Sequence, residues 1–115
     1  MSRRSPDRSR ARPPAHAILF AALGDKTRLA LIARLGAGAP SSIAQLTAST
    51  RLTRQAVTKH LRVLERSGLV HSVRAGRESR FALDPRPIAD MRQYLDLISR
   101  QWDQALERLK ALVED

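Results

Sequence analysis

Apolar positions in the first third of the chain follow the spacing of two short helices. An apolar run begins at Ala15, and its spacing predicts a helix that ends near Gly24. Asp25 is a suitable N-cap for a second helix, which we expect to end within residues 36–40, where two glycines and a proline occur. The apolar face of this second helix carries Leu29, Ile32 and Leu35.

The next segment has the end signals of two helices joined by a tight turn. Ser42 and Gln45 have the spacing of a capping box, which predicts the start of a short helix. Residues 50–52 are expected to form a tight turn. Thr53 is then a good N-cap for a longer helix, and Gly68 is placed to follow its end. This order of elements predicts a helix-turn-helix.

Two strand-like runs follow the longer helix, at residues 69–74 and 79–83, with Gly76 in the gap between them. Alternation of residue types in both runs predicts a two-stranded β-hairpin. The alternating positions are Leu69, His71 and Val73 in the first run and Ser79, Phe81 and Leu83 in the second. Residues 84–87 contain two prolines and are expected to interrupt the chain.

The rest of the chain, from Ile88 to about Val113, has no internal proline or glycine and predicts one long helix. Its apolar residues alternate between spacings of three and four, which is the pattern of a coiled-coil seam. The seam consists of Ile88, Met91, Leu95, Ile98, Trp102, Ala105, Leu109 and Leu112. We expect this helix to pack on its own domain and on a symmetry mate; the alternative is a helix that only covers the core.

The helix expected over residues 53–67 has two different faces. Val57, Leu61 and Leu64 have helical spacing and are expected to face the core. The opposite face carries Gln55, Thr58, Lys59, Arg62 and Arg66. Amide, hydroxyl and cationic groups hydrogen-bond base edges and phosphates, so this face predicts docking into a major groove of DNA.

Positive charge is concentrated in two parts of the chain. The net charge at pH 7 is +10, to which residues 1–14 contribute +4 and residues 51–80 contribute +6, while residues 86–115 sum to −1. A polyanion is the natural partner of the central block. The arginines around the hairpin gap, which we expect to contact phosphates or a minor groove, are Arg74, Arg77 and Arg80.

Length and composition restrict the other classes of function. We expect one domain at residues 15–115, preceded by a disordered basic tail at residues 1–14. The chain has no cysteine, which excludes disulfides and thiol chemistry, and no apolar run that approaches the length of a membrane span. Since no nucleophile–base pair or glycine-rich phosphate loop is present, we expect that the protein is not an enzyme. The absence of cysteine and of a membrane span, together with the basic charge, leads us to expect a cytoplasmic, nucleoid-associated protein.

Three segments of the chain resemble the ArsR family of winged-helix bacterial transcriptional regulators, and the resemblance extends from about Ala15 to the C-terminus. The opening helices of the family resemble FAALGDKTRLALIARL, with the signature Leu-Gly-Asp-x-Thr-Arg-Leu at residues 23–29. The family's recognition helix resembles LTRQAVTKHLRVLERSGLV, and its wing resembles RAGRESRFAL at residues 74–83.

This resemblance implies a mainly α fold, a winged helix-turn-helix with a two-stranded β-hairpin wing and a long C-terminal dimerisation helix. It also implies a homodimer, joined through its first and last helices, that represses an operator until a signal releases it. The expected DNA-binding residues are Arg51, Thr53, Arg54, Gln55, Thr58, Lys59, His60, Arg62, Arg66, Arg74, Arg77 and Arg80. The expected dimer interface consists of Ile18, Leu19, Met91, Leu95, Ile98, Trp102, Ala105 and Leu109.

The chain departs from the family pattern in two respects. Arg51 occupies a turn position where the family often has glycine, so a positive φ there would be strained, although the side chain is also placed to contact a phosphate. The metal-sensing members carry cysteine in the third helix or histidine and carboxylate ligands on the last, and this chain has neither set. Its three histidines, His16, His60 and His71, lie on different elements, so we expect no metal and no other cofactor.

Two alternatives to a sequence-specific regulator remain open at this point: a sequence-tolerant, nucleoid-type DNA-binding protein, and an adaptor whose winged helix binds another protein. The sequence identifies neither the operator nor the inducing signal. It also leaves open whether the protein represses or activates, and whether the tail contacts DNA.

Overall fold

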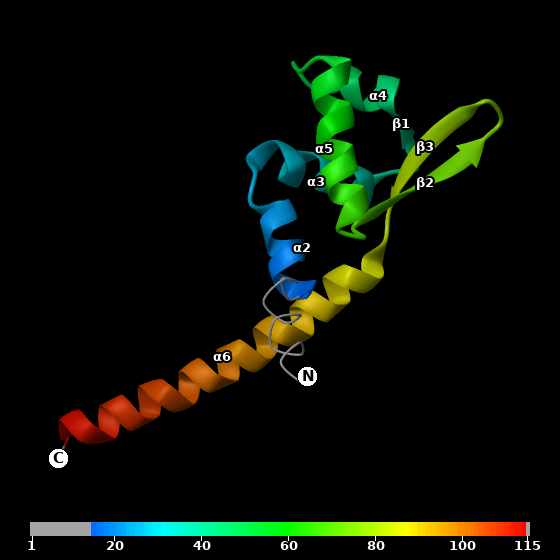
Figure 1. The fold of residues 1–115 in the computed structure, drawn as a ribbon. Helices are drawn as coiled ribbons and strands as arrows, with labels where there is room; N and C mark the ends of the chain where they lie inside the picture. The colour runs from blue at the N-terminus through cyan, green and yellow to red at the C-terminus, as the bar shows by residue number, and fades with distance from the viewer. Residues whose placement is uncertain (1–14, 115) are drawn as a thin grey trace, which may run out of the picture.

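The computed structural model describes residues 15–114; the tail expected at residues 1–14 lies outside this range. The elements follow one another in the order α2 (Ala15–Leu23), α3 (Lys26–Ala37), β1 (Ser41–Ser42), α4 (Ile43–Ala48), α5 (Arg54–Arg66), β2 (Val70–Ala75), β3 (Glu78–Leu83) and α6 (Pro85–Glu114). The helices α2 to α5 and the sheet form one body, from which α6 extends as a long arm (Figure 1).

Polar side chains begin three of the helices as the sequence predicted. The carboxylate of Asp25 accepts the backbone N–H of Arg28 at 2.9 Å in the first turn of α3. At the start of α4, Ser42 Oγ accepts the backbone N–H of Gln45 at 3.1 Å, and the Gln45 side chain accepts that of Ser42 at 2.9 Å. Thr53 Oγ1 accepts a backbone N–H in the first turn of α5 at 3.1 Å. Each bond satisfies a donor that the helix itself leaves unpaired.

Two glycines adopt a left-handed backbone conformation. Gly68 has φ of +85° directly after α5, and Gly76 has φ of +66° at the tip of the hairpin, a region that is favourable only without a Cβ atom. No other type of residue has positive φ within residues 15–114. Arg51, in the turn between α4 and α5, therefore carries none of the backbone strain that a left-handed conformation would impose.

The sheet has three antiparallel strands in the order β1-β3-β2, one more than the hairpin that the sequence predicted. Strand β1 is only two residues long, and it adds Ser41 opposite Phe81. The alternation expected in the first strand does not appear in its burial. Leu69 and Val70 are both buried, and the rest of β2, residues 71–75, is exposed.

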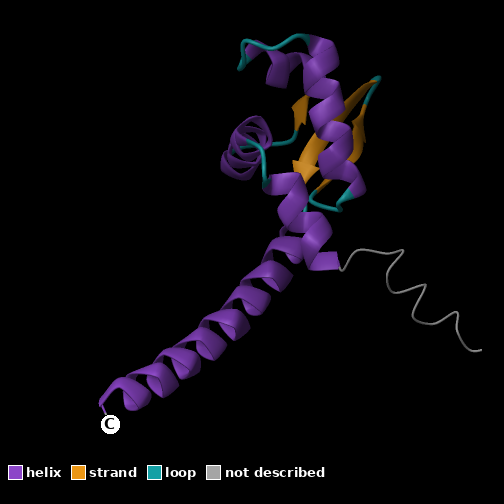
Figure 2. Ribbon diagram, turned by 60° about the vertical axis from the view of Figure 1, so that its left-hand side comes forward, coloured by secondary structure: helices purple, strands orange, loops and turns teal. Residues whose placement is uncertain are grey.

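One hydrophobic core fixes the orientation of α5. Its fully buried side chains are Leu31, Leu46, Val57, Leu61, Leu64, Leu69 and Val70. α5 packs on α2, α3, α4 and β2, and it crosses in front of the sheet in Figure 2. Burial of each leucine contributes about 1.5–3 kcal/mol, so turning the apolar face of α5 outward would be strongly unfavourable. The polar face of this helix is consequently held toward solvent.

The connection from the wing to α6 is a single residue, Asp84. Asp84 donates its backbone N–H to the carbonyl of Leu69 at 2.8 Å, and α6 begins at the next residue, Pro85. The expectation that residues 84–87 interrupt the chain was therefore wrong. Proline lacks a backbone N–H and has a φ suited to a helix, so it is tolerated in the first turn, where it starts the helix rather than breaking it.

Beyond its first turns, α6 leaves the body of the subunit. Met91 is its only buried residue within the described range, whereas Leu95, Trp102 and Leu109 are 51%, 66% and 55% exposed. Neither α6 nor any other helix of residues 15–114 has an apolar stretch that would cross a membrane. The helix therefore presents an apolar seam that its own subunit does not cover.

Asp84 gives the start of α6 a pH-dependent contribution to stability. Its carboxylate accepts hydrogen bonds from the Arg86 side chain, the shortest at 2.6 Å, and one from the Arg86 backbone N–H at 3.0 Å. These bonds lower the pKa of Asp84 from 3.8 to about 2. A depressed carboxyl pKa stabilises the folded state above pH 3.8, and this stabilisation is lost as the pH falls toward 2.

We expect Asp84→Asn to lower the free energy of unfolding at neutral pH, because the ionised partner of Arg86 is lost. The difference from the unmodified protein should close as the pH falls toward 2, where Asp84 itself becomes protonated. Urea unfolding over a series of pH values measures both effects. Asp90→Asn on the same helix is the matched control, and a difference that stays constant down to pH 2 would contradict the assignment.

Candidate nucleic-acid interface

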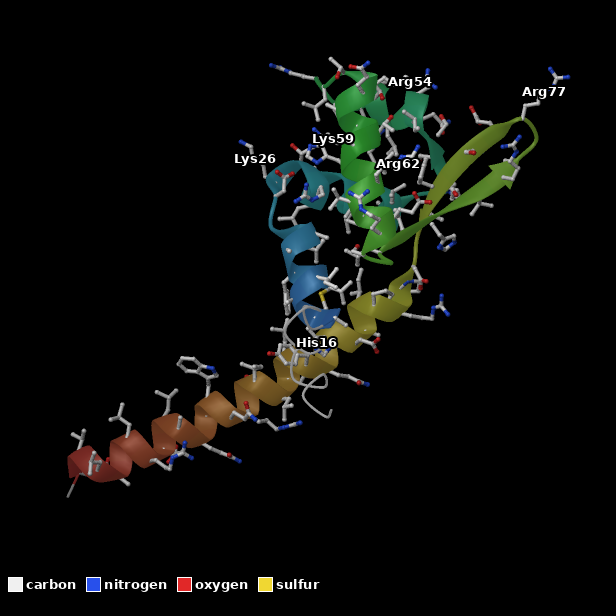
Figure 3. The ribbon with its side chains drawn as sticks, in the orientation of Figure 1. His16, Lys26, Arg54, Lys59, Arg62 and Arg77 are labelled. Carbon is white, nitrogen blue, oxygen red and sulfur yellow. The ribbon has the colours of Figure 1, made fainter. Side chains whose placement is uncertain are left out.

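The outward face of α5 carries most of the polar side chains that the sequence assigned to DNA. Arg54, Gln55 and Lys59 are exposed, as are Arg62 and Arg66 further along the same helix. Figure 3 shows Arg54 at the N-terminal end of α5 and Lys59 and Arg62 projecting to different sides of it. The face is broad enough for one edge to meet bases while the flanks meet phosphates.

Two hydroxyls on this helix already have partners in the subunit, which restricts what they can offer to DNA. Thr53 Oγ1 accepts a backbone N–H as the N-cap of α5. Thr58 Oγ1 donates its proton to the backbone carbonyl of Arg54 at 2.8 Å. Thr58 therefore retains acceptor lone pairs and a methyl group, which suit a base amino group or a thymine methyl.

The wing carries its arginines on both faces of the hairpin and at its tip. Arg74 pairs with Ser79 and Val73 pairs with Arg80 across the two strands. Since side chains alternate along a strand, Arg74 lies on the sheet face that also carries buried Phe81, and Arg80 lies on the opposite face. Arg77 lies at the tip (Figure 3). The three arginines are thus not gathered into one cluster.

Arg80 differs from Arg77 in having an acidic partner. Its Nε donates to Glu78 Oε1 at 3.0 Å, and both side chains are more than a third exposed. An exposed pair of this kind contributes little to stability, but it offsets the charge that Arg80 presents. Arg77 makes no ion pair with another described residue. Among the described residues, Arg77 at the tip of the wing thus presents its charge without an ion-pair partner, whereas the charge of Arg80 is partly offset.

The structure joins the wing to the start of α5 across a shared groove. A cavity of about 380 Å³ lies between α4, the beginning of α5 and the wing, and Arg54 and Arg77 both line it. Two cations on either side of one groove suit a phosphate between them, although Glu78 also lines this groove. The groove thus brings the start of α5 close to the tip of the wing.

His60, expected at the DNA interface, is held largely within the subunit. Its Nδ1 lies 3.2 Å from Nη1 of Arg28. Because arginine only donates, this ring nitrogen is the acceptor in the contact with Arg28. Nδ1 is also 3.8 Å from Asp25, which is too long for a hydrogen bond.

Arg28 is the residue that sequence reasoning missed. Its Nε donates to the carbonyl of Ala22 at 2.5 Å and Nη2 donates to that of Ala21 at 3.4 Å, so it caps the end of α2 while it contacts His60 of α5. The backbone N–H of Arg28 also lowers the pKa of Asp25. The family signature at residues 23–29 contains Asp25 and Arg28, and it was the available signal for this contact.

Comparisons with known proteins agree with this geometry. A family model of a helix-turn-helix domain matches residues 23–73. The HTH-type transcriptional regulator Rv2034 of Mycobacterium tuberculosis is 35% identical over 111 residues, which cover 96% of this chain and 91% of the relative. An ArsR-like transcriptional regulator from Rhodococcus sp. RHA1 has 35% identity and a TM-score of 0.77, over 85% of this chain and 92% of that chain. The chain belongs to the ArsR family.

The ArsR family assignment makes the protein a transcriptional regulator with a winged helix-turn-helix fold for DNA binding, in which α4 and α5 form the helix-turn-helix and β2–β3 form the wing. The homodimeric winged helix-turn-helix domain of Mb0332 from Mycobacterium bovis, a possible ArsR-family regulator, has the same fold. Its TM-score is 0.59 at 21% identity, over 82% of this chain and 83% of that chain.

The residues expected at an ArsR-type dimer interface divide into a buried and an exposed group. Leu19 and Met91 are each only 6% exposed and pack in the core of their own subunit. Ile98 and Ala105 are half-buried. The exposed group is Ile18, Leu95, Trp102 and Leu109. Phe20, which the sequence did not single out for the interface, is 37% exposed and lines an apolar cavity of about 460 Å³ between α2 and α6.

The histidines and acidic side chains of residues 15–114 are distributed over different elements. No three histidine or carboxylate side chains of this range come together in a group that could hold a metal ion. Asp90, Asp96 and Asp103 are exposed along α6, and His16 stacks on Tyr94 with ring centroids 4.3 Å apart.

Proposed function

We propose that the protein is a homodimeric repressor that binds a palindromic operator through α5 and the wing. The observation that carries this proposal is the pairing of two surfaces in one subunit. One is the exposed polar face of α5 with the basic wing beside it, and the other is the uncovered apolar seam of α6. The first surface suits DNA, and the second suits another copy of the chain.

The seam of α6 supports a dimer on physical grounds. Leu95, Trp102, Leu109 and Leu112 are all more than half exposed and lie on one face of a 30-residue helix. Apolar side chains at coiled-coil spacing are stabilised by packing into the matching positions of a partner helix. Phe20 of α2 extends the same apolar surface, because it lines a cavity together with Leu95 of α6, and we expect the partner's helices to fill that cavity.

A two-fold dimer determines the form of the operator. Its two recognition helices enter successive major grooves about 34 Å apart, so the half-sites are inverted copies of each other. We assign base contacts to Gln55, Thr58 and Lys59, and phosphate contacts to Arg51, Arg54, Arg62, Arg66 and the wing arginines Arg74, Arg77 and Arg80. The homodimeric state of Mb0332 is consistent with this assembly. Such a regulator would work at the chromosome, in the cytoplasm.

Selection of bound fragments from random DNA tests this proposal. A palindrome with half-sites one helical turn apart is the expected result. Equal affinity for unrelated DNA would instead show a nucleoid-type protein, and no binding to any duplex would favour an adaptor that binds another protein. A reporter gene under the selected operator distinguishes repression from activation, and repression is expected.

Two of the three wing arginines, Arg77 and Arg80, provide a test of the phosphate contacts. We expect Arg77→Ala to weaken binding to all sequences alike and to reduce the slope of log affinity against log salt by about one contact per wing. Arg80→Ala should have a smaller effect, because Glu78 already offsets that charge. Titrations at several salt concentrations measure both slopes, and equal losses for the two variants would contradict the different roles.

A further inference from the structure

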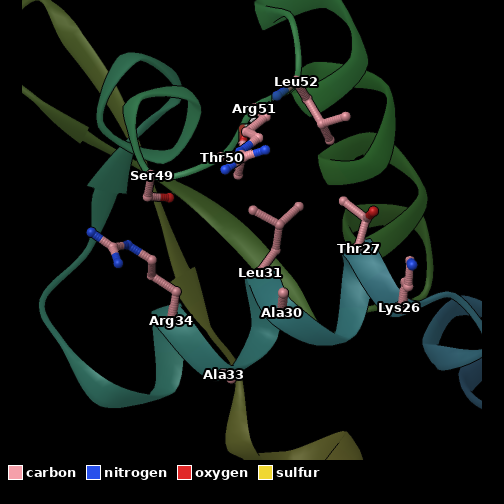
Figure 4. Close-up of a pocket in the computed structure, with 10 residues that line it drawn as sticks. All are labelled: Lys26, Thr27, Ala30, Leu31, Ala33, Arg34, Ser49, Thr50, Arg51 and Leu52. Carbon is pink, nitrogen blue, oxygen red and sulfur yellow. Dashed lines mark hydrogen bonds between the residues drawn. The ribbon is translucent and has the colours of Figure 1, made fainter.

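A groove lies between α3 and the turn that joins α4 to α5 (Figure 4), and Arg51 is its only lining residue to which the proposed function assigns a DNA contact. Its volume is about 790 Å³, which is within the range of sites for drug-sized molecules. One wall is a face of α3, and the other is the turn of residues 49–52. The groove therefore touches the segment that positions the start of the recognition helix.

Short side chains keep this groove open. Thr27, Ala30 and Ala33 occupy the face of α3 that lines it, and none of them reaches across to the turn. Leu31 is fully buried beneath them, and half-buried Leu52 faces it from the other side, as Figure 4 shows. The groove thus has an apolar floor. A ligand whose apolar part covers this floor would remove apolar surface from water, which favours binding.

The rim of the groove is cationic. Lys26 and Arg34 stand at its two ends on α3, and Arg51 faces them from the turn (Figure 4). The ion pairs within residues 15–114 involve none of these three side chains. Positive charge around an apolar floor is complementary to a molecule with an apolar body and an anionic group.

We propose that this groove binds a small amphipathic carboxylate and that its occupancy lowers the affinity for DNA. The carboxylate is held by Arg34 and Arg51, and the apolar body lies over Ala30 and Leu31. A ligand held by Arg51 withdraws that side chain from DNA and fixes the turn that positions α5. The effect on DNA rests on the proposed function, whereas the binding of the carboxylate does not.

Calorimetry on the full chain without DNA tests the binding step. The probes are 2-naphthoate and decanoate, with 2-naphthamide as a neutral analogue of the same shape. We expect both carboxylates to bind, and the amide to bind about tenfold more weakly or worse, because charge-assisted hydrogen bonds to the rim are lost. Binding of neither carboxylate at millimolar concentration, or equal binding of the amide, overturns the proposal.

Two variants locate the site. Arg34→Gln removes charge from the rim and should weaken 2-naphthoate by about tenfold. Ala30→Phe fills the groove without changing the charge, and it should abolish binding of both carboxylates. Arg100→Gln, on the far side of the α6 seam, is the control and should leave binding unchanged. Retained binding in both groove variants would place the carboxylate elsewhere and refute the proposal.

Operator titrations with and without 2-naphthoate test the regulatory step. The unmodified protein should lose affinity in the presence of 2-naphthoate, and Arg34→Gln should bind DNA normally but no longer respond. A large loss of DNA affinity in Arg34→Gln without any ligand would show a phosphate contact instead, and would overturn the proposal. Failure to bind any operator contradicts the proposed function and leaves the calorimetric result standing, so the two failures are distinguishable.

Discussion

Trp102→Asp should convert the protein to a monomer and reduce its affinity for a two-half-site operator by about 100-fold or more. Trp102 is 66% exposed in the subunit and lies in the middle of the α6 seam. A buried carboxylate in a dimer interface has no compensating partner there, so the seam can no longer pair. A monomer then binds each half-site independently and loses the gain from linking the two binding events.

Light scattering after size-exclusion chromatography gives the mass of the variant, and gel shifts compare DNA with one and with two half-sites. Gln93→Asp introduces the same charge on the opposite side of α6 and is the matched control; it should remain a dimer. Trp102→Asp should bind DNA with a single half-site as tightly as the unmodified protein does. If Trp102→Asp stays dimeric, the seam is not the interface.

Gln55→Ala should relax sequence preference at one base position in each half-site, by about 1–3 kcal/mol per position. The amide of Gln55 is exposed near the N-terminus of α5, and within residues 15–114 it makes no hydrogen bond. It is therefore free to bond the edge of an adenine with both its donor and its acceptor. Overall affinity for non-specific DNA should change little, because no charge is removed.

Affinities for a set of operators that vary one base pair at a time measure this effect. Gln101→Ala on exposed α6 is the control and should preserve the full preference. An unchanged preference at every operator position in Gln55→Ala would remove Gln55 from the base-contacting residues. A uniform loss at all positions would instead assign Gln55 to a phosphate.

The helix-turn-helix was predictable because its signals are local. The hydroxyl of Ser42 and the amide of Gln45 satisfy donors within one turn, and Gly68 permits a backbone conformation that other residues resist. Spacing alone also separated the buried face of α5 from its polar face. Such features depend on residues within a few positions of one another, so they can be recognised without knowledge of the rest of the fold.

The features that the sequence did not predict depend on distant parts of the chain. Strand β1 exists because Ser41 meets Phe81, forty positions away, and two residues make no periodic pattern. Leu19 and Met91 share the apolar character of the interface residues and differ only in being covered by their own core. The contact between Arg28 and His60 likewise joins two helices whose approach is set by packing.

The hydrogen bond from the backbone N–H of Asp84 to the carbonyl of Leu69 affects how much variation in the distance between operator half-sites the proposed dimer can accept. Backbone hydrogen bonding links the wing to the start of α6, and α2 packs on both α5 and α6, so we expect the proposed dimer to hold its two α5 helices at a nearly fixed spacing. A single inserted base pair rotates one half-site by about 34° relative to the other, since B-DNA has roughly 10.5 base pairs per turn. If the connection between α5 and α6 does not bend to follow that rotation, both α5 helices cannot enter their major grooves at once. We therefore expect the dimer to have a much lower affinity for operators whose half-sites are one base pair further apart.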